Sequence, residues 1–168
     1  MPTLIIEDGS IVAGANSYLS VADAETILDN QGYSFGAITE DQKQQFLIRS
    51  ATYLESYRDA YQGYKVSCEQ SLQWPRSNVY IDCCAFAANA IPNELKLAQA
   101  LGAYYESTGK SLQAVTGGQN IASKEVVGAV KVSYFDNGSV DGYTIFTDIN
   151  NSLDPLLKRS GGLVTFRV

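Results

Sequence analysis

The chain has 168 residues, which suits a single domain with a hydrophobic core that needs no metal or disulfide. Hydrophobic residues make up 45% and charged residues 18%, a globular composition rather than a disordered one. The net charge of −6 opposes phosphate binding, and the lack of histidine excludes Ser-His-Asp and Cys-His catalysis and histidine metal sites, so we expect no enzyme, metal or cofactor.

Negative charge is concentrated at the start of the chain. The first 42 residues hold seven acidic residues and no Lys or Arg, so they carry −7 while the remainder carries +1. The ordinary interpretation is a solvated acidic face. The sharper one is a surface past which a polyanion moves without binding. Five acids are then candidates for facing a channel: Glu7, Asp8, Asp23, Glu25 and Asp29.

Two helices are predicted first. Ser20 is a candidate N-cap for a helix over 20–31, which Gly32 ends. Thr39 and Gln42 form a capping box for a second helix over 40–61, in which apolar residues recur every three or four positions.

Residues 64–90 lack clear periodicity, and the only Trp lies within them. Pro75 forces Trp74 out of the helical region, which predicts a shaped turn. Trp74, Pro75 and Arg76 either anchor the core, with Arg76 satisfying loop carbonyls or a carboxylate, or form a contact between subunits.

A third helix is expected from Pro92 to Ser107. Apolar side chains, including Leu97, Leu101 and Tyr104, cover most of its circumference. Such a helix is buried either at the centre of a domain or between subunits, so it is a first hint of an oligomer.

The pattern then becomes strand-like. Residues 123–135 alternate and are rich in valine, which predicts a hairpin within about 121–145 and a turn at 136–138. A helix is expected over 148–158, capped by Thr147 and disturbed by Pro155. Residues 1–160 would form one domain, and 161–168 a tail. After Gly161-Gly162 comes a strand-like segment that must borrow a sheet edge: Leu163, Val164, Thr165, Phe166, Arg167 and Val168.

Other residues offer little chemistry. The three cysteines form no CxxC pattern, which favours free thiols in a reducing cytosol, and the first residues do not form a signal peptide. Phosphate-binding glycine motifs are missing. Asp136, Asp141 and Asp148 are the best acid set for a cation, but aspartates are common in turns.

Several segments resemble a family of head-tail connector proteins of tailed bacteriophages. These segments are Glu7-Asp8-Gly9, Asn16-Ser17-Tyr18, Tyr61-Gln62-Gly63, the run from Gln70 to Arg76, and Ile91-Pro92 before a helix with Lys and Ala. Some members of this family carry the label of single-stranded-DNA-binding primosome-like proteins.

The resemblance implies a mainly α fold: a small helical bundle with a β-hairpin and an extended C-terminal strand. It implies a ring of about twelve copies below the portal, in the neck of the virion, assembled in the host cytoplasm. The ring would bind the portal and the next neck or tail-completion protein, and would pass double-stranded DNA without specific binding. The segment 163–168 would dock on the portal, or alternatively pair with the chain's own hairpin.

A structural adaptor without catalysis is therefore the leading hypothesis. A single-stranded-DNA-binding module is the alternative, and exposed lysines in the structure would favour it. An enzyme ranks third, since without histidine it would need a pair of carboxylates in a pocket.

Overall fold

The computed structural model of the protein describes residues 2–112, 123–126, 130–133 and 146–158. Its elements, in chain order, are α1 (Val21–Asn30), α2 (Glu40–Glu55), β1 (Tyr64–Lys65), β2 (Arg76–Ser77), β3 (Tyr80–Ile81), β4 (Cys84–Ala85), α3 (Asn93–Ser107), β5 (Ser123–Val126), β6 (Val130–Ser133), α4 (Thr147–Leu153) and the 3-10 helix η1 (Asp154–Leu156).

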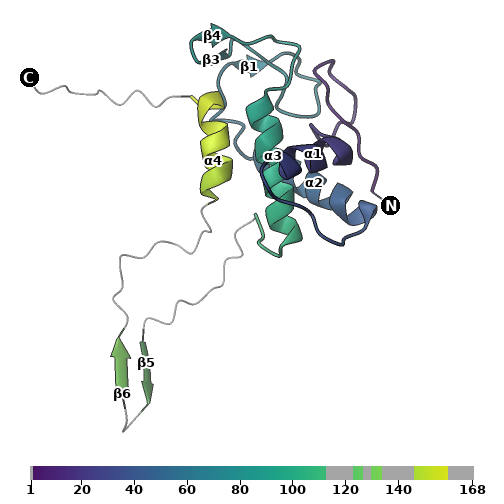
Figure 1. Ribbon diagram of the computed structural model, residues 1–168. Coiled ribbons are helices and arrows are strands. Elements are labelled where there is room, and N and C mark those ends of the chain that lie inside the picture. Colours follow the sequence, from purple (N-terminus) through teal and green to yellow (C-terminus); the bar gives the residue numbers. More distant parts are fainter. Residues whose placement is uncertain (1, 113–122, 127–129, 134–145, 159–168) are drawn as a thin grey trace, which may run out of the picture.

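The expectation of a mainly α fold is wrong. Over the described ranges the strands pair antiparallel as β1–β2, β3–β4 and β5–β6, so helices and small sheets together make a small mixed α/β fold (Figure 1). The sequence did not reveal β1 to β4 because strands of two residues are too short to show an alternating pattern.

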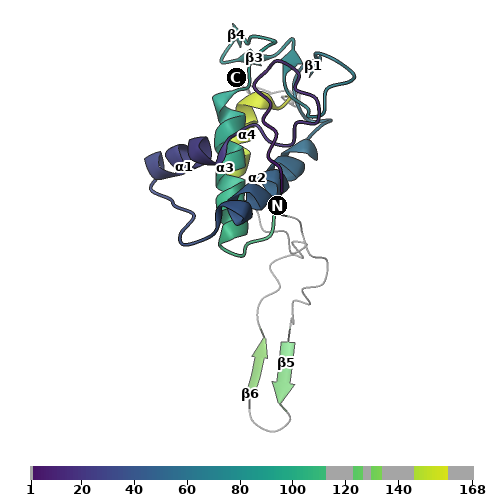
Figure 2. The same cartoon turned by 90° about the vertical axis from the view of Figure 1, so that its right-hand side faces the viewer.

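Helix α3 is the centre of the domain. It contacts α1, α2, α4 and η1, and Figure 2 shows it upright between its neighbours. Leu95 and Ala98 are fully buried and Leu101 nearly so. The chain's own elements therefore bury much of this helix, while Leu97 and Tyr104 are half-buried.

Helices α2 and α3 approach closely at one glycine. A Cβ atom on Gly102 would collide with the side chain of Ser50. In the close contact, the Ser50 hydroxyl donates a hydrogen bond of 2.8 Å to the carbonyl oxygen of Gln99. This serine therefore satisfies its own buried hydroxyl at the point where the helices meet.

The predicted starts of the first two helices are confirmed, and the predicted end of the second is wrong. The Ser20 hydroxyl accepts from the Asp23 amide at 3.1 Å, and Thr39 and Gln42 form the capping box. The sequence predicts that the second helix reaches residue 61, but it ends at Glu55. Beyond that point, backbone amides bond the carbonyl three residues earlier instead of four. These turns carry Tyr61 into the core, where it is fully buried.

The last helix is also shorter than expected. It begins at Thr147, with Phe146 rather than Thr147 as the N-cap, and after Leu153 it continues as η1. Pro155 explains the change, since proline disrupts the interior of an α-helix but fits the first turn of a new one.

The end of the described chain closes the domain. The Gln62 amide donates to the Leu156 carbonyl at 2.9 Å, and the Lys158 amide donates to the Ala60 carbonyl at 2.7 Å. Tyr61 and Leu157 thereby form an antiparallel bridge. The residues just before the tail are thus part of the folded body.

Strands β5 and β6 form the expected hairpin, in a different register. Glu125 lies opposite Lys131 and Val126 opposite Val130, so the connection is 127–129 rather than the predicted turn at 136–138. Among the described elements, the two strands contact only each other. Residues 136–138, and the whole tail from 159 to 168, lie outside the described residues.

Candidate functional site

The N-terminal acids do not all lie on one surface. Glu7 is fully buried, so it does not face a channel as expected. One carboxylate oxygen accepts from the amides of Gly9 at 2.9 Å and Ile11 at 3.0 Å, and the other accepts from Val12 at 2.9 Å. A carboxylate accepts several amide hydrogen bonds well, so this residue shapes the N-terminal loop.

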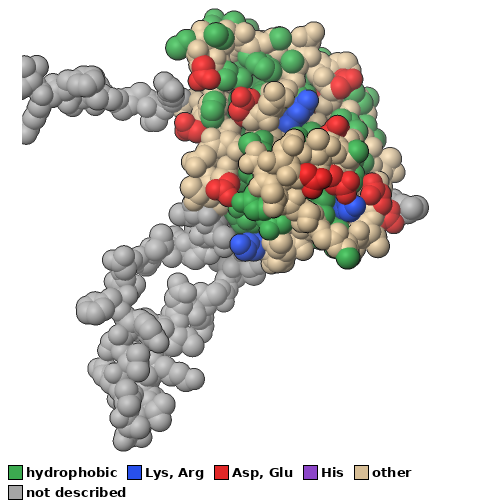
Figure 3. All heavy atoms as spheres, in the orientation of Figure 1, with side chains coloured by type: hydrophobic (Ala, Val, Ile, Leu, Met, Phe, Trp, Pro, Cys, Tyr) green, Lys and Arg blue, Asp and Glu red, His purple; other side chains and the backbone are tan. Residues whose placement is uncertain are grey.

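The exposed acids gather on α1 and the start of α2. Asp23 and Asp29 are exposed and Glu25 is half-buried, and Figure 3 shows acidic side chains over these two helices. Asp8 is exposed on the preceding loop, where hydrogen bonds from Ser10 lower the pKa of its carboxyl. We call α1 together with Glu40 and Asp41 of α2 the acidic face.

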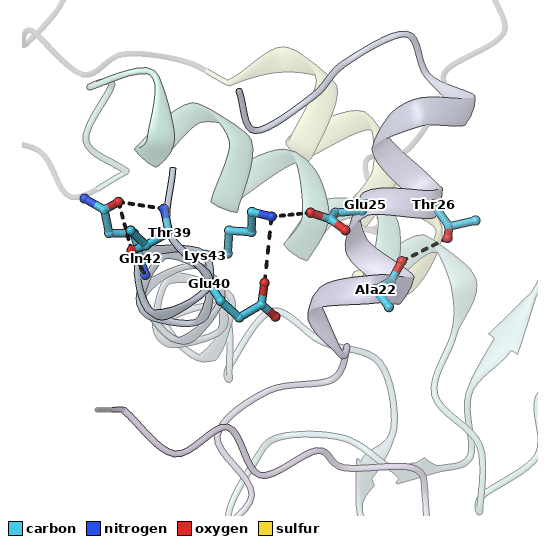
Figure 4. A network of polar contacts seen from close by, with 7 residues as sticks. All are labelled: Ala22, Glu25, Thr26, Thr39, Glu40, Gln42 and Lys43. Atoms are coloured by element: carbon cyan, nitrogen blue, oxygen red, sulfur yellow. Dashed lines mark hydrogen bonds and ion pairs between the residues drawn. The ribbon is translucent and has the colours of Figure 1, made fainter. Parts of the chain in front are cut away.

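One lysine lies within this face. Lys43 reaches from α2 to α1, and its ammonium lies 2.5 Å from the Glu25 carboxylate and 3.8 Å from that of Glu40 (Figure 4). The bond to Glu25 is the main cause that raises the pKa of Lys43. Such exposed pairs contribute at most about 1 kcal/mol, but this one uses a cation that could otherwise contact a phosphate.

Most other described cations are also engaged inside the chain. Arg49 lies 3.4 Å from the Glu106 carboxylate, and Lys158 donates to the Asp59 carbonyl at 3.0 Å. Lys65 donates to the Gln70 carbonyl at 3.0 Å, and Lys110 lies over the Tyr105 ring. The described surface thus presents its acids more freely than its bases.

Trp74 is a core residue. It is fully buried, and its ring packs edge-on against Tyr61 and Phe86 at centroid distances of 5.8 and 6.3 Å. Its peptide bond to Pro75 is cis, and Pro75 is buried as well. Of the two interpretations from the sequence, the core anchor fits this position.

Arg76 holds the loops around Trp74 together. It is 5% exposed, and its guanidinium donates to the carbonyls of Gln62 at 2.7 Å and Gly63 at 2.9 Å. It also donates to the Gln73 side chain at 3.2 Å. The sequence-based expectation that Arg76 satisfies loop carbonyls is confirmed.

A buried polar network joins the N-terminal loop to the Trp74 loop. The Tyr18 hydroxyl donates to the Glu55 carboxylate at 2.6 Å, which also accepts from the Gln73 amide at 3.1 Å. Burial raises the pKa of Glu55, although both hydrogen bonds oppose this shift. Burial and the nearby carboxylate also raise the pKa of Tyr18 well above its usual value.

The α3 residues proposed as subunit contacts or core anchors have separate places. Leu101 is buried in the core. Tyr104 is half-buried and stacks on Tyr33 with ring centroids 4.7 Å apart. Leu97 is half-buried and lines a shallow cavity of about 340 Å³ with Ile27 of α1.

A second, larger groove was not foreseen from the sequence. It has a volume of about 750 Å³ and lies between the β3–β4 turn and η1. Its lining is polar and apolar in nearly equal parts: Gln62, Gly63, Asn78, Tyr80, Asp82, Cys83, Asp154, Pro155 and Lys158. Asp82 and Cys83 adopt positive φ angles of 49° and 66°, a conformation that the two-residue turn requires.

The end of the molecule around this groove exposes apolar side chains. Tyr64 is 62% exposed, Tyr80 is 54% exposed and Val66 is 41% exposed. Figure 3 shows hydrophobic side chains over the β3–β4 end. The free thiols of Cys68, Cys83 and Cys84 are exposed too. Of these side chains, Tyr80 and Cys83 line the groove itself.

The remaining candidates do not assemble into a chemical centre. Asp148 accepts a 2.7 Å hydrogen bond from Tyr105. Burial is the main cause that raises the pKa of Tyr105 to about 12, and this hydrogen bond adds to the shift. Asp136 and Asp141 lie outside the described residues. The described ranges contain no group of three acids or cysteines arranged to hold a metal, and no helix in them could cross a membrane.

The fold and surface define a small mixed α/β domain with an acidic face and a groove of mixed polarity. The chain belongs to the family described as "Putative DnaT-like ssDNA binding protein", whose model matches residues 2–168. This agrees with the label that some members of the resembled group carry, and it does not name a head-tail connector. No curated protein and no solved structure matches the chain.

Proposed function

We propose that the protein is a structural head-tail connector subunit of a bacteriophage neck, which forms a ring below the portal and extends the DNA channel. The observation that carries this proposal is the charge arrangement. The acidic face is exposed, while Lys43, Arg49, Lys65 and Lys158 are engaged by groups of the same chain.

This arrangement suits a surface past which DNA slides. Binding to a nucleic acid backbone gains its free energy from cations that neutralise phosphates and release counterions. A wall of carboxylates instead repels phosphates, so double-stranded DNA passes without stopping. Asp8, Asp23, Glu25 and Asp29 remain our candidates for that wall, whereas Glu7 does not.

The proposal includes partners and a location. The ring would hold about twelve copies in the virion neck, bound to the portal on one side and to the next neck or tail-completion protein on the other. The segment 163–168 would add to an edge of the portal as a strand, with its apolar side chains in pockets.

Single-stranded DNA binding is the second candidate, and the family description favours it over the connector. Exposed Tyr64 and Tyr80 could serve as stacking platforms. The nearby groove carries Asp82 and Asp154 against Lys158, so its charges oppose a phosphate backbone.

Two measurements distinguish the candidates. Fluorescence anisotropy with labelled single- and double-stranded oligonucleotides, at low and physiological salt, measures DNA binding. Co-sedimentation with the portal ring, followed by electron microscopy, measures assembly. The connector predicts rings on the portal and no DNA binding at physiological salt. DNA binding that weakens steeply with salt, without portal assembly, would support the second candidate instead.

A charge-reversal variant provides the matched control. Asp29→Lys with Asn30→Lys changes two exposed residues at the end of α1, where cations are favourable for the helix. If the acidic face repels DNA, this variant should retain DNA at low salt where the unmodified protein does not. If the unmodified protein binds DNA equally well, the acidic face has no such role.

A further inference from the structure

The groove between the β3–β4 turn and η1 has unbalanced charge. Asp82 and Asp154 lie in its lining, and neither forms an ion pair with another described residue. The Lys158 ammonium, which also lines the groove, donates to the Asp59 carbonyl. Tyr80 and Pro155 add apolar surface beside the carboxylates. The groove therefore suits an extended peptide with apolar side chains and a positive charge.

The chain itself carries such a peptide, beginning at the rim of the groove. Lys158 is fixed to the body by its amide bond to Ala60 and lines the groove, and ten residues follow it. Those ten residues contain Arg159 and Arg167 and no acidic side chain. Leu163 to Val168 alternate in the manner of a strand, and Gly161-Gly162 permits a reversal of direction.

We propose that in the free subunit the segment 163–168 docks in this groove of its own chain, with Arg167 near Asp82 and Asp154. Ten residues span about 33 Å when extended, enough to reverse and return to the groove. A segment tethered at the rim is present at an effective concentration in the millimolar range, so modest contacts suffice and the chain's own segment outcompetes that of a second copy.

Docking has a consequence for access to the groove. A partner that binds the same surface, or that binds the segment itself, must first displace the segment. Its apparent affinity therefore equals its intrinsic affinity multiplied by the fraction of molecules in which the segment is undocked. The docked segment would also cover part of the exposed apolar end near Tyr80. The proposal is independent of the connector function, since it concerns the subunit alone.

Cys83 serves as a reporter, because it lines the groove while Cys68 does not. The experiment uses the full chain with Cys68→Ser and Cys84→Ser, so that Cys83 is the single thiol. A companion chain with Cys83→Ser and Cys84→Ser keeps Cys68. Both react with N-ethylmaleimide, an uncharged reagent that attacks the thiolate, and the modified fraction is measured by mass spectrometry. Rates are compared at several pH values, so that a change in the thiolate fraction is separated from a change in access.

The tail variant Phe166→Ser with Arg167→Ser tests docking. We expect it to raise the labelling rate of Cys83 about tenfold, the ratio for a segment docked roughly nine-tenths of the time. The rate at Cys68 should not change. An unchanged rate at Cys83 would overturn the proposal, as would an equal rise at both cysteines, because that reports loosening of the whole domain.

A second pair of variants tests the charges. Asp82→Asn keeps a side chain that tolerates positive φ, and Asp154→Asn removes the other carboxylate. Together they should raise the Cys83 rate, and adding Arg167→Ser should then change it little further, since both act on one contact. Fully additive effects would contradict a contact between Arg167 and these carboxylates.

Protein concentration distinguishes the chain's own groove from that of a second copy. Docking within one chain predicts a Cys83 rate independent of concentration and a monomer mass by light scattering. Protection that grows with concentration, with a rising mass, would show that the segment docks on another copy and would overturn the proposal. Portal binding enters none of these measurements, so its failure would count only against the connector function.

Discussion

Two neighbouring parts of the stretch from 64 to 90 contrast sharply. In the Trp74 loop, Trp74, Pro75 and Arg76 are buried, and the Arg76 guanidinium donates to the carbonyls of Gln62 and Gly63. In the β3–β4 hairpin, Tyr80, Cys83 and Cys84 are exposed beside a groove. The first part holds the fold together, whereas the second leaves side chains available to a partner.

The contrast clarifies what the family resemblance rests on. Its most specific segments, Asn16-Ser17-Tyr18 and the run from Gln70 to Arg76, meet in the buried network around Glu55. These motifs therefore report how the domain is built. The groove that could bind a partner lies beside them and carries little of the motif.

The largest expected effect breaks the buried loop. Trp74→Ala should destabilise the protein by about 3–5 kcal/mol, because it removes a fully buried ring that contacts Tyr61 and Phe86. Chemical denaturation measures the loss. Tyr80→Ala is the matched control on the exposed hairpin and should change stability by less than about 0.5 kcal/mol. Equal losses would remove the contrast.

Arg76→Met tests the polar part of the same loop. Methionine fills much of the space but leaves the carbonyls of Gln62 and Gly63 without their donor, so we expect a loss of about 2–3 kcal/mol. Exposed Arg58→Met is the control and should have little effect. If Arg76→Met melts like the unmodified protein, these hydrogen bonds orient the loops but do not stabilise the fold.

Glu55→Gln sharpens the comparison through pH. Burial raises the pKa of Glu55 in the folded state, so folding disfavours its charged form. The protein therefore loses stability as pH rises from the unfolded pKa of Glu55, near 4.5, through its folded pKa. Glutamine can still accept from Tyr18 and Gln73 without this charge. We expect the variant to be at least as stable at pH 7, and its advantage to disappear below about pH 4.5.

Denaturation curves from pH 4 to 8 would test this expectation. Glu55→Ala is the control, because it removes the acceptor and should be destabilising at every pH. A Glu55→Gln variant that loses stability only above pH 5 would mean that the charged carboxylate is favourable in the network.

The smallest effect is expected at the hairpin thiols. Cys83→Ser with Cys84→Ser should shift stability by less than about 0.5 kcal/mol, since both side chains are exposed and free. Thermal melting with and without a reducing agent measures the effect. A large loss would place these cysteines among the residues that hold the fold.

The sequence predicted helix starts better than anything else. Ser20, Thr39 and Gln42 are local signals, and they cap the helices as expected. The end of α2 depends on a contact that is distant in the sequence, the pairing of Tyr61 with Leu157, and no local pattern predicts this pairing. Local patterns do not predict β1 to β4 either, because each of these strands has only two residues.

The site was predicted less well, for physical reasons. Charge counting placed Glu7 on the surface because composition cannot show that three backbone amides enclose its carboxylate. The groove is assembled from three separated parts of the chain, 62–63, 78–83 and 154–158, so it has no signature in the sequence. Arg76 could be assigned because Trp-Pro already indicated a tight turn with carbonyls to satisfy.

The bridge between Tyr61 and Leu157 also constrains the order of events during synthesis. The carbonyl of Ala60 waits for the Lys158 amide, which is translated almost a hundred residues later. Until then, the face of α3 that α4 will cover is exposed on the nascent chain. The subunit therefore completes its core only after residue 158 has been translated, and a fusion placed after residue 158 should disturb it less than one placed before 146.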